Sequence, residues 1–428
     1  MAGTPEPAAA AAIAGTTLAG TAAPKAPLSR RIVNTDEPVI VQMRDLMTLN
    51  PDVMSLGQGV VYWLPPDAVL AAAQAAVLDP VSSGYGVDDG TKELRAALVE
   101  KVKEENGLVD SSIMVTAGAN QAFVNVVLTL CDPDDAVVLF KPFYFNHRMA
   151  FQMTGVTDIV YGPCDPDTLH PSADWLEEAL SGKEGRKVPK VVVITNPNNP
   201  TGTYVPEDLL RRIAAICEKA GSWLVLDNTY EYFMYDGNRH VCMEGPHILN
   251  IFSFSKAYGM MGWRVGYIAY PNSSPRLGPS LIKAQDTIPI CANLIGQQAA
   301  LAALQSASAG KPFVDRLIQT LAPNLEQARD ALAVLTGPAV GGRVWGGEGA
   351  IYLWAKLPNG CEDDGAVVRW LVSEHGVVVI PGSASGAPGH IRVSFANLPA
   401  EKYRVAAGRL KKGLEELVKG GVKFPLDR

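Results

Sequence analysis

The chain has 428 residues, of which 47% are hydrophobic and 19% are charged, and its formal net charge is −7. This length suits two domains, or one large α/β domain with a smaller one, and the composition is that of an ordinary globular protein. The negative charge and the dispersed basic residues argue against nucleic acid as a primary partner. No apolar run approaches the ~20 residues that a membrane span needs.

The first 27 residues differ in composition from the rest. Residues 1–27 are rich in Ala, Gly, Thr and Pro, and Glu6 and Lys25 are their only charged side chains. This composition predicts a disordered extension. A transit peptide stays open because acidic residues are scarce, although arginine is missing until Arg30.

The cysteines and histidines argue against a metal site. The six cysteines are scattered without a C-x-x-C pair, and no H-E-x-x-H motif occurs. This pattern favours a reducing compartment, so we expect a cytoplasmic protein without a bound metal.

Residues 28–60 are expected to form an N-terminal arm that packs on the smaller domain. The arm ends in the segment L-G-Q-G at 56–59, and the aromatic pair Tyr62 and Trp63 follows it. The pair offers aromatic surface for a ligand, and the alternative is a plain loop with a buried Trp.

The next part of the chain, 61–310, alternates strands with helices, as parallel α/β sheets do. Strands are predicted over 113–116, 136–140, 156–161, 191–195, 223–226, 248–254 and 265–269. Helices are predicted over 68–78, 91–106, 121–131, 173–180, 206–220 and 282–304. We therefore expect a large domain with a mostly parallel central sheet flanked by helices.

A second, smaller α/β domain is expected over 311–428. A long helix over 312–335 would join the two domains. After it we predict strands at 351–355, 377–380 and 390–395 and helices at 365–375 and 400–419.

Polar and small residues follow several predicted strands of the large domain. The turn A-G-A-N at 117–120 opens a helix, N-P-N-N-P-T-G at 196–202 follows a buried strand, and Asp227 ends the next one. Open α/β sheets bind ligands at this edge, and backbone N–H groups at a helix N-terminus suit a phosphate. A buried carboxylate needs a cationic partner, and the alternative for Asp227 is a simple helix cap.

The segment from Ser253 to Tyr267, S-F-S-K-A-Y-G-M-M-G-W-R-V-G-Y, carries the strongest chemical signal. A lysine among aromatic residues loses hydration, which lowers its pKa and frees an amine nucleophile, here Lys256. Arg264 and the flanking serines suit a phosphate. A nucleophilic lysine beside a phosphate site suggests pyridoxal phosphate, and the alternative is a solvated loop lysine.

Several motifs in the correct order resemble the fold-type-I class I/II aminotransferases over about residues 30–420. They are L-G-Q-G, Y-x-x-x-x-G-x-x-x-L-R at 85–95, T-A-G-A-N-Q, N-P-N-N-P-T-G, D-x-x-Y, S-F-S-K followed by G-x-R, and R-V-S-F at 392–395. The resemblance implies the fold-type-I architecture and pyridoxal phosphate as the cofactor.

The resemblance also implies catalytic roles. Lys256 would bind the cofactor covalently and move the proton, and Asp227 would pair with the pyridine nitrogen. Tyr230 and Asn199 would donate hydrogen bonds to the phenolic oxygen of the cofactor ring. His147 would orient Asp227 from behind.

Other cofactor contacts follow from the same resemblance. Tyr144 would stack on the cofactor ring. The phosphate would be held by Ala119, Asn120, Ser253, Ser255 and Arg264. Tyr85 would reach the phosphate of the partner subunit, which implies a homodimer with shared active sites.

For the substrate, the resemblance implies that Arg392 binds the α-carboxylate, with Gly59, Tyr62, Trp63 and Asn199 around the rest. The chain departs from the family where V-V-Y-W replaces the P-D-F that often follows L-G-Q-G, and where Tyr144 replaces a Trp or Phe. No second arginine is evident that would select a dicarboxylate. The aromatic residues instead indicate an apolar or aromatic side chain.

A finer likeness is to plant-type aromatic/methionine aminotransferases, carried by TAGANQAFVN, NTYEYFMYDG and GGEGAIYLWAKLP. It implies transfer of the amino group of methionine, tryptophan or phenylalanine to a 2-oxo acid such as indole-3-pyruvate, an auxin precursor, with ping-pong kinetics. A pyridoxal-phosphate-dependent C–S lyase or an aminocyclopropane-carboxylate synthase would use the same cofactor residues. A catalytically inactive, cofactor-binding regulator is the non-enzymatic alternative.

Overall fold

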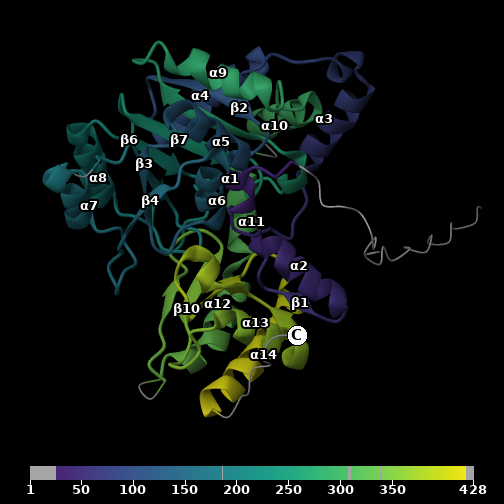
Figure 1. Ribbon diagram of the computed structural model, residues 1–428. Helices are drawn as coiled ribbons and strands as arrows, with labels where there is room; N and C mark the ends of the chain where they lie inside the picture. The colour runs from purple at the N-terminus through teal and green to yellow at the C-terminus, as the bar shows by residue number, and fades with distance from the viewer. Residues whose placement is uncertain (1–25, 186, 307–309, 338–339, 421–428) are drawn as a thin grey trace, which may run out of the picture.

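The computed structural model describes residues 26–185, 187–306, 310–337 and 340–420. The predicted disordered extension, 1–27, lies outside the described residues except for its last two. Figure 1 shows a larger unit above and a smaller one below, with α11 (Lys311–Gln319) between them. The predicted domain boundaries at residues 60 and 310 stay predictions.

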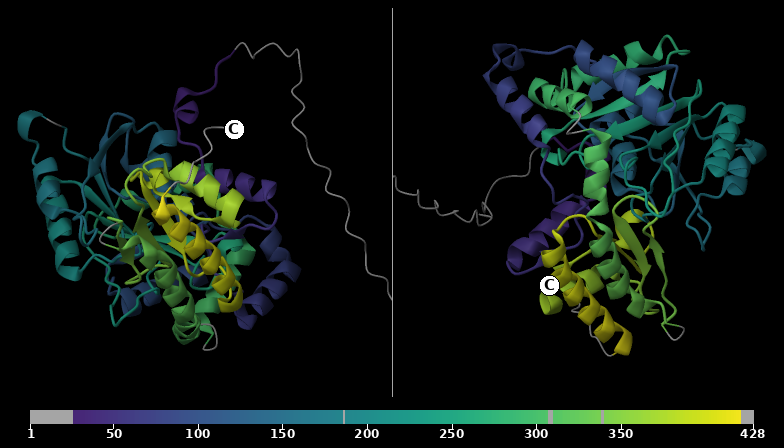
Figure 2. Two further views of the ribbon diagram at one scale, coloured as in Figure 1. Left: turned by 90° about the horizontal axis from the view of Figure 1, so that it is seen from below. Right: turned by 180° about the vertical axis from the view of Figure 1, so that it is seen from behind.

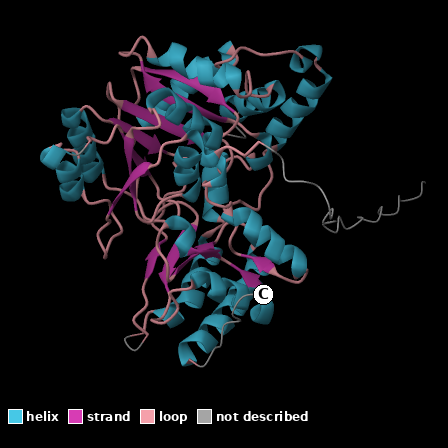
Figure 3. Ribbon diagram, viewed as in Figure 1, coloured by secondary structure: helices cyan, strands magenta, loops and turns pink. Residues whose placement is uncertain are grey.

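A seven-stranded sheet forms the centre of the larger unit (Figure 3). Its strand order is β2-β8-β7-β6-β5-β3-β4. All neighbours are parallel except β8, which runs antiparallel to both β2 and β7. The prediction of a mostly parallel sheet is confirmed. The strands are β2 (Ser111–Thr116), β3 (Ala136–Phe140), β4 (Asp158–Gly162), β5 (Val191–Thr195), β6 (Trp223–Asp227), β7 (Ile248–Ser253) and β8 (Gly266–Pro271).

Helices cover both faces of this sheet because alternate residues of its buried strands point to opposite sides. Val137 and Leu139 of β3 pack in one cluster with α5, α6 and α9. Val138 and Phe140 pack in another with α7 and α8. The helices of this unit are α3 (Asp67–Leu78), α4 (Lys92–Asn106), α5 (Ala119–Leu130), α6 (Phe145–Thr154), α7 (Ala173–Ala179), α8 (Glu207–Ala220), α9 (Leu277–Thr287) and α10 (Leu294–Gln305).

The smaller unit contains an antiparallel sheet of order β12-β13-β10-β9. Its core holds the fully buried Tyr352, Trp354 and Tyr403. Its elements are α12 (Ala322–Leu332), β9 (Val344–Gly346), β10 (Tyr352–Lys356), α13 (Asp364–His375), β11 (Val377–Val378), β12 (Ile380–Pro381), β13 (His390–Ser394) and α14 (Ala400–Lys419).

The N-terminal arm comprises α1 (Arg30–Val33), α2 (Val39–Leu49) and β1 (Met54–Ser55). Part of the arm, α2 and β1, lies against the smaller unit (Figure 2), whereas α1 lies beside α6 of the larger unit, where Asp36 pairs with Arg148. Strand β1 pairs in parallel with β11, and the Leu56 carbonyl accepts a hydrogen bond from the Ser394 N–H at 2.7 Å. Residues near the start of the chain (β1) therefore pair with residues near its end (β11) in the smaller unit.

Three predicted elements are wrong in extent. The helix over 282–304 is broken after Thr287, because Pro289 and the left-handed Ile290 (φ 66°) leave the helix and a new one starts at Leu294. The helix over 312–335 divides into α11 and α12, where Pro323 in the first turn of α12 cannot donate to a preceding turn. The strand over 377–380 divides between two sheets as β11 and β12.

Among the described residues, we find no helix with the length and apolar character needed to cross a membrane.

Candidate active site

A cavity of about 370 Å³ lies between the two units. Its floor is formed at the carboxyl ends of three neighbouring strands by Thr195, Asp227 and Ser253. The smaller unit contributes Tyr352 and Arg392. The arm contributes Ile40, Arg44, Gln58, Gly59 and Val60. The predicted ligand edge of the sheet therefore faces residues that lie far away in the sequence.

Lys256 follows β7 and lines this cavity. Its Nζ forms no hydrogen bond or ion pair with any of the residues that the structure describes. Burial, followed by the positive charges of Arg264 and Arg392, lowers the pKa of Lys256 to about 8. A substantial fraction of this amine is therefore neutral and nucleophilic near physiological pH.

Asp227 is 6% exposed at the end of β6. Burial alone would raise its pKa, but hydrogen bonds from His147 and Thr229 lower it below the usual value. His147 Nε2 lies 3.1 Å from Asp227 Oδ2, and the Thr229 hydroxyl and N–H donate to Oδ1 at 2.7 and 3.0 Å. The carboxylate thus stays ionised and can pair with a further cation in the cavity.

Arg392 is 2% exposed and projects from β13 into the cavity. Its Nη1 donates to Asn199 Oδ1 at 2.8 Å, and its Nη2 donates to the Gly57 carbonyl at 2.7 Å. Its buried Nε has no hydrogen-bond partner among the described residues. The guanidinium group is therefore fixed in place yet keeps donors for an incoming carboxylate.

The other end of the cavity suits an anion. Arg264 Nη2 donates to the Ala117 carbonyl at 3.3 Å, and Nη1 lies 3.5 Å from the Ser255 hydroxyl. Gly118 caps α5 with a φ of 85°, and a Cβ atom there would overlap the Arg264 guanidinium group. The first residues of α5, Ala119 and Asn120, line the cavity, so helix N–H groups and a cation converge there.

Tyr230 and Tyr144 complete the inner wall. Tyr230 is 3% exposed, and its hydroxyl contacts that of Tyr352. The Tyr144 hydroxyl accepts a hydrogen bond from Asn146 Nδ2 at 2.9 Å, and its ring meets that of His147 edge-on at 5.1 Å. Burial raises the pKa of Tyr144 to about 12, so this hydroxyl stays protonated at neutral pH.

Together these groups fit the cofactor that the sequence predicts. The low-pKa lysine suits the aldehyde of pyridoxal phosphate, and the buried ionised carboxylate suits its ring nitrogen. The tyrosine hydroxyls suit its phenolic oxygen, and the helix N-terminus beside a cation suits its phosphate. Among the described residues, Arg392 Nε and Lys256 Nζ lack a hydrogen-bond partner, so both are available to a ligand.

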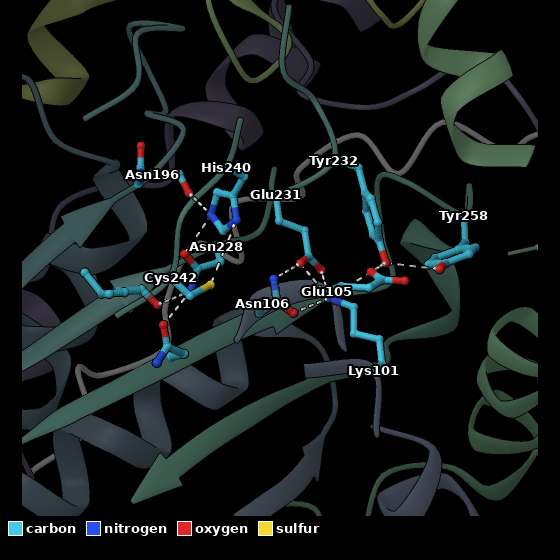
Figure 4. A network of polar contacts seen from close by, with 12 residues as sticks. Lys101, Glu105, Asn106, Asn196, Asn228, Glu231, Tyr232, His240, Cys242 and Tyr258 are labelled. Atoms are coloured by element: carbon cyan, nitrogen blue, oxygen red, sulfur yellow. Dashed lines mark hydrogen bonds and ion pairs between the residues drawn. The ribbon is translucent and has the colours of Figure 1, made fainter. Parts of the chain in front are cut away.

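A second polar network lies behind the turn that carries Tyr230 (Figure 4). Lys101 Nζ from α4 contacts both carboxylate oxygens of Glu231 at 2.6 and 2.5 Å and Asn106 Oδ1 at 2.9 Å. His240 Nε2 lies 3.1 Å from the Asn196 carbonyl and 3.0 Å from Asn228 Oδ1. The 227–232 turn is therefore bonded to α4 through Lys101 and Glu231. It is also linked to the 196–202 turn through His240.

Besides His147, which contacts Asp227 from outside the cavity, three predicted site residues lie outside the cavity lining. Trp63 is 7% exposed, and its indole N–H donates to the Ala257 carbonyl at 3.2 Å. The Tyr62 hydroxyl contacts the Thr320 hydroxyl at 2.7 Å. Tyr85 is 85% exposed. Substrate binding by Tyr62 and Trp63, and contact of Tyr85 with a partner subunit, stay predictions.

The structure brings further residues to the cavity that sequence reasoning missed. Tyr352 stands in the quoted motif G-A-I-Y-L-W, but nothing in its spacing assigns it a role. Arg44 and Ile40 lie one helical turn apart on α2, and Phe145 directly follows Tyr144. The i, i+4 spacing on the arm was the one available signal for the α2 pair.

The sequence matches the family model for aminotransferase class I and II over residues 51–410. It is 56% identical over 395 residues to the aromatic aminotransferase ISS1 of Arabidopsis thaliana, which covers 92% of this chain and 98% of that protein. It is 31% identical to a bifunctional aspartate aminotransferase and glutamate/aspartate-prephenate aminotransferase of Petunia hybrida, over 87% of this chain and 79% of that one.

Among solved structures, the fold is similar to aspartate aminotransferase from Thermus thermophilus with maleate. The TM-score is 0.80 at 26% identity, with 91% of this chain and 100% of that chain covered. These matches confirm the fold-type-I architecture and the family resemblance seen in the motifs. The protein is therefore an enzyme that belongs to the class I and II aminotransferase family.

Proposed function

We propose that the protein is a pyridoxal-phosphate-dependent aminotransferase for apolar and aromatic amino acids. It would move the amino group from methionine, phenylalanine or tryptophan to a 2-oxo acid such as indole-3-pyruvate, leaving the donor as its 2-oxo acid. The observation that carries the proposal is the unpartnered, low-pKa Lys256 in one cavity with Asp227 and Arg392.

When bound, pyridoxal phosphate supplies an aldehyde for amines and a ring that accepts electrons from the Cα–H bond. Asp227 would hold a proton on the ring nitrogen, while Tyr230 and Asn199 would donate to the phenolic oxygen. The phosphate would lie among Ala119, Asn120, Ser253, Ser255 and Arg264. Lys256 would take the proton from Cα as general base and return it to the cofactor side.

The side-chain end of the cavity supports an apolar substrate. With Arg392 holding the α-carboxylate, the remaining wall includes Ile40, Val60, Tyr144 and Phe145. These side chains offer apolar contact and ring faces to an aromatic or thioether group. The name of the Arabidopsis relative, an aromatic aminotransferase, supports the same substrate class.

A substrate matrix tests this function. Purified protein reconstituted with pyridoxal phosphate is incubated with amino donors paired with 2-oxo acids, and both products are quantified. We expect methionine, phenylalanine and tryptophan each to yield their own 2-oxo acid. An equal amount of the amino acid derived from the acceptor should form. Release of ammonia or of an aminocyclopropane product instead would favour the lyase or synthase alternatives, and a lack of turnover would favour the regulator.

One observation favours a second acceptor class. Arg44 is exposed on α2, lines the cavity and forms no side-chain hydrogen bond or ion pair with the described residues. A cation at the cavity rim can bind the distal carboxylate of a dicarboxylic 2-oxo acid. The substrate matrix should therefore include 2-oxoglutarate. Turnover with indole-3-pyruvate but not with 2-oxoglutarate would show that dicarboxylic 2-oxo acids are not acceptors.

A homodimer with shared active sites is part of the proposal. Tyr85 is 85% exposed although it is the first residue of the family motif at 85–95, and the segment around it exposes several large apolar side chains. These are Leu64, Leu70, Val77, Leu78, Val81 and Val87. Such a surface suits an interface between copies of the chain. Sedimentation of a single species of monomer mass would exclude it.

A reducing compartment, the cytoplasm, is the proposed location. All six cysteines are free thiols, and burial raises the pKa of four of them to about 12 or beyond. Free thiols without a structural disulfide are typical of reducing conditions. Fractionation of cells that produce the full-length chain tests this.

A further inference from the structure

Tyr352 is a cavity residue to which neither the motifs nor the proposed roles give a task. It is 1% exposed on β10, and the antiparallel register places it diagonally from Arg392 on the neighbouring strand β13. Side chains in this relation lie on the same face of a sheet and within reach of each other. Tyr352 thus lies between Tyr230, which would bind the phenolic oxygen of the cofactor, and Arg392, which would bind the substrate carboxylate.

The hydroxyl of Tyr352 contacts the hydroxyl of Tyr230. Burial raises the pKa of both tyrosines, so both hydroxyls keep their protons at neutral pH. One of the two hydroxyl protons forms the hydrogen bond between the tyrosine oxygens. The other is available for a hydrogen bond to a third group. If Tyr352 donates to Tyr230, the proton of Tyr230 is free to point into the cavity, and a hydroxyl that accepts a hydrogen bond is a stronger donor.

The ring of Tyr352 has a separate contact. The centre of the Arg392 guanidinium group lies 4.3 Å from the ring centroid, as in a cation–π contact. Gly59 leaves room for the hydroxyl, because a Cβ atom on Gly59 would overlap it. The other titratable groups that face the tyrosine pair are Asp227 and Tyr144.

We propose that Tyr352 is a positioning residue that serves both ends of the site. Its hydroxyl would hold Tyr230 as a hydrogen-bond donor toward the phenolic oxygen of the cofactor, and its ring would fix the plane of Arg392 for the substrate carboxylate. The inference rests on the proposed function.

The hydroxyl is tested with Tyr352→Phe in the holoenzyme. A weaker donor at Tyr230 leaves the phenolic oxygen more basic, which stabilises the protonated form of the nitrogen that joins Lys256 to the cofactor. We expect the pH midpoint of the visible absorbance of the bound cofactor to rise by about half a unit. Tyr235→Phe is the matched control, because its hydroxyl donates to the Ala350 carbonyl at 2.9 Å outside the cavity, and we expect no shift.

The ring is tested by comparing Tyr352→Phe with Tyr352→Leu. The phenylalanine variant keeps the ring, so KM for the amino acid should change by less than about twofold, whereas the leucine variant should raise KM about tenfold. The affinity for pyridoxal phosphate, which depends on the distant phosphate end, should stay equal in both. Gly59→Ala provides an independent test, because its methyl group would displace the hydroxyl and should reproduce the absorbance shift of Tyr352→Phe.

Two results would overturn the inference. The absorbance midpoint of Tyr352→Phe could equal that of the wild type, or the phenylalanine and leucine variants could share one KM. Failure of the proposed function is distinguishable, because the wild type itself would then show no transamination, even where it keeps a cofactor band.

Discussion

Two lysines near the same turn show how the molecule uses buried charge in two ways. Lys101 is 7% exposed, and Glu231, Asn106 and the nearby Glu105 surround its ammonium group (Figure 4). Lys256 lines the cavity together with Tyr230 of that turn; Arg264 and Arg392 lower its pKa, and it has no partner among the described residues. The paired lysine stabilises the fold, whereas the unpaired one is left available for chemistry.

This difference is physical rather than a matter of residue type. A buried cation with a hydrogen-bonded carboxylate is compensated and chemically inert. A buried cation beside other cations is destabilised as an ion, which lowers its pKa and makes its neutral, nucleophilic form accessible. Both lysines lose hydration on burial, but Lys101 has a carboxylate partner that offsets this cost, whereas Lys256 has none among the described residues.

The largest effect should come from removing Lys256. We expect Lys256→Ala to lower kcat/KM for transamination by about four orders of magnitude or more, because both covalent binding and proton transfer are lost. The visible band of the bound cofactor should disappear as well. Lys283→Ala, an exposed lysine on α9, is the control and should behave as the wild type. Full activity of Lys256→Ala would refute the proposed chemistry.

Removing Lys101 should act on stability instead. Lys101→Met leaves Glu231 as an uncompensated buried carboxylate, which we expect to cost about 3–5 kcal/mol, or about 10²–10⁴ in the folding equilibrium. Chemical unfolding measures this change. The double variant Lys101→Met/Glu231→Leu should recover most of the loss. If the single variant unfolded like the wild type, the network would not have the structural role that its pairing indicates.

The pKa of Lys256 predicts how the cofactor-free protein responds to pH. Capture of added pyridoxal phosphate should speed up as pH rises and level off near pH 8, and at pH 7 it should be about 300-fold faster than for a lysine with the usual pKa. At Lys256 the folded state also binds fewer protons than the unfolded state between about pH 8 and 10.5, so the contribution of this one group to stability should rise with pH across that window. Rapid-mixing absorbance checks the first effect. A capture rate that keeps rising to pH 10 would contradict the lowered pKa.

The smallest effect concerns an exposed cation. Arg44→Gln should lower kcat/KM for 2-oxoglutarate by about fivefold, because an exposed ion pair contributes at most ~1 kcal/mol. Phenylpyruvate carries no distal carboxylate and serves as the internal control. An equal loss for both acceptors would mean that Arg44 does not distinguish them.

Sequence reasoning could find the residues whose chemistry is local. Lys256 between two serines and Asp227 at the end of an apolar strand are recognisable because strand ends meet at one edge of a parallel sheet. Arg392 could be assigned only through the family motif, since its strand lies in the other unit.

Contacts across long separations could not be read in this way. Tyr352 gains its meaning from Tyr230 and from an antiparallel register that no local pattern specifies. The side-chain direction of Trp63 depends likewise on the Ala257 carbonyl to which its indole N–H donates, so its predicted contact with the substrate cannot be judged from local sequence. The breaks in the two long helices depend on prolines whose neighbours also carry helical periodicity.

The pairing of β1 with β11 has a consequence for the order in which the protein is made. Met54 pairs with Val377, so the partners are 323 residues apart (377 − 54), and Arg392 donates to the Gly57 carbonyl across a similar gap. A ribosome has synthesised most of the chain before this layer can close. The central sheet can form earlier, but the part of the cavity that contains Arg392 is completed only when the C-terminal strands emerge. Incomplete chains would therefore hold Lys256 without the arginine that is proposed to bind the substrate carboxylate.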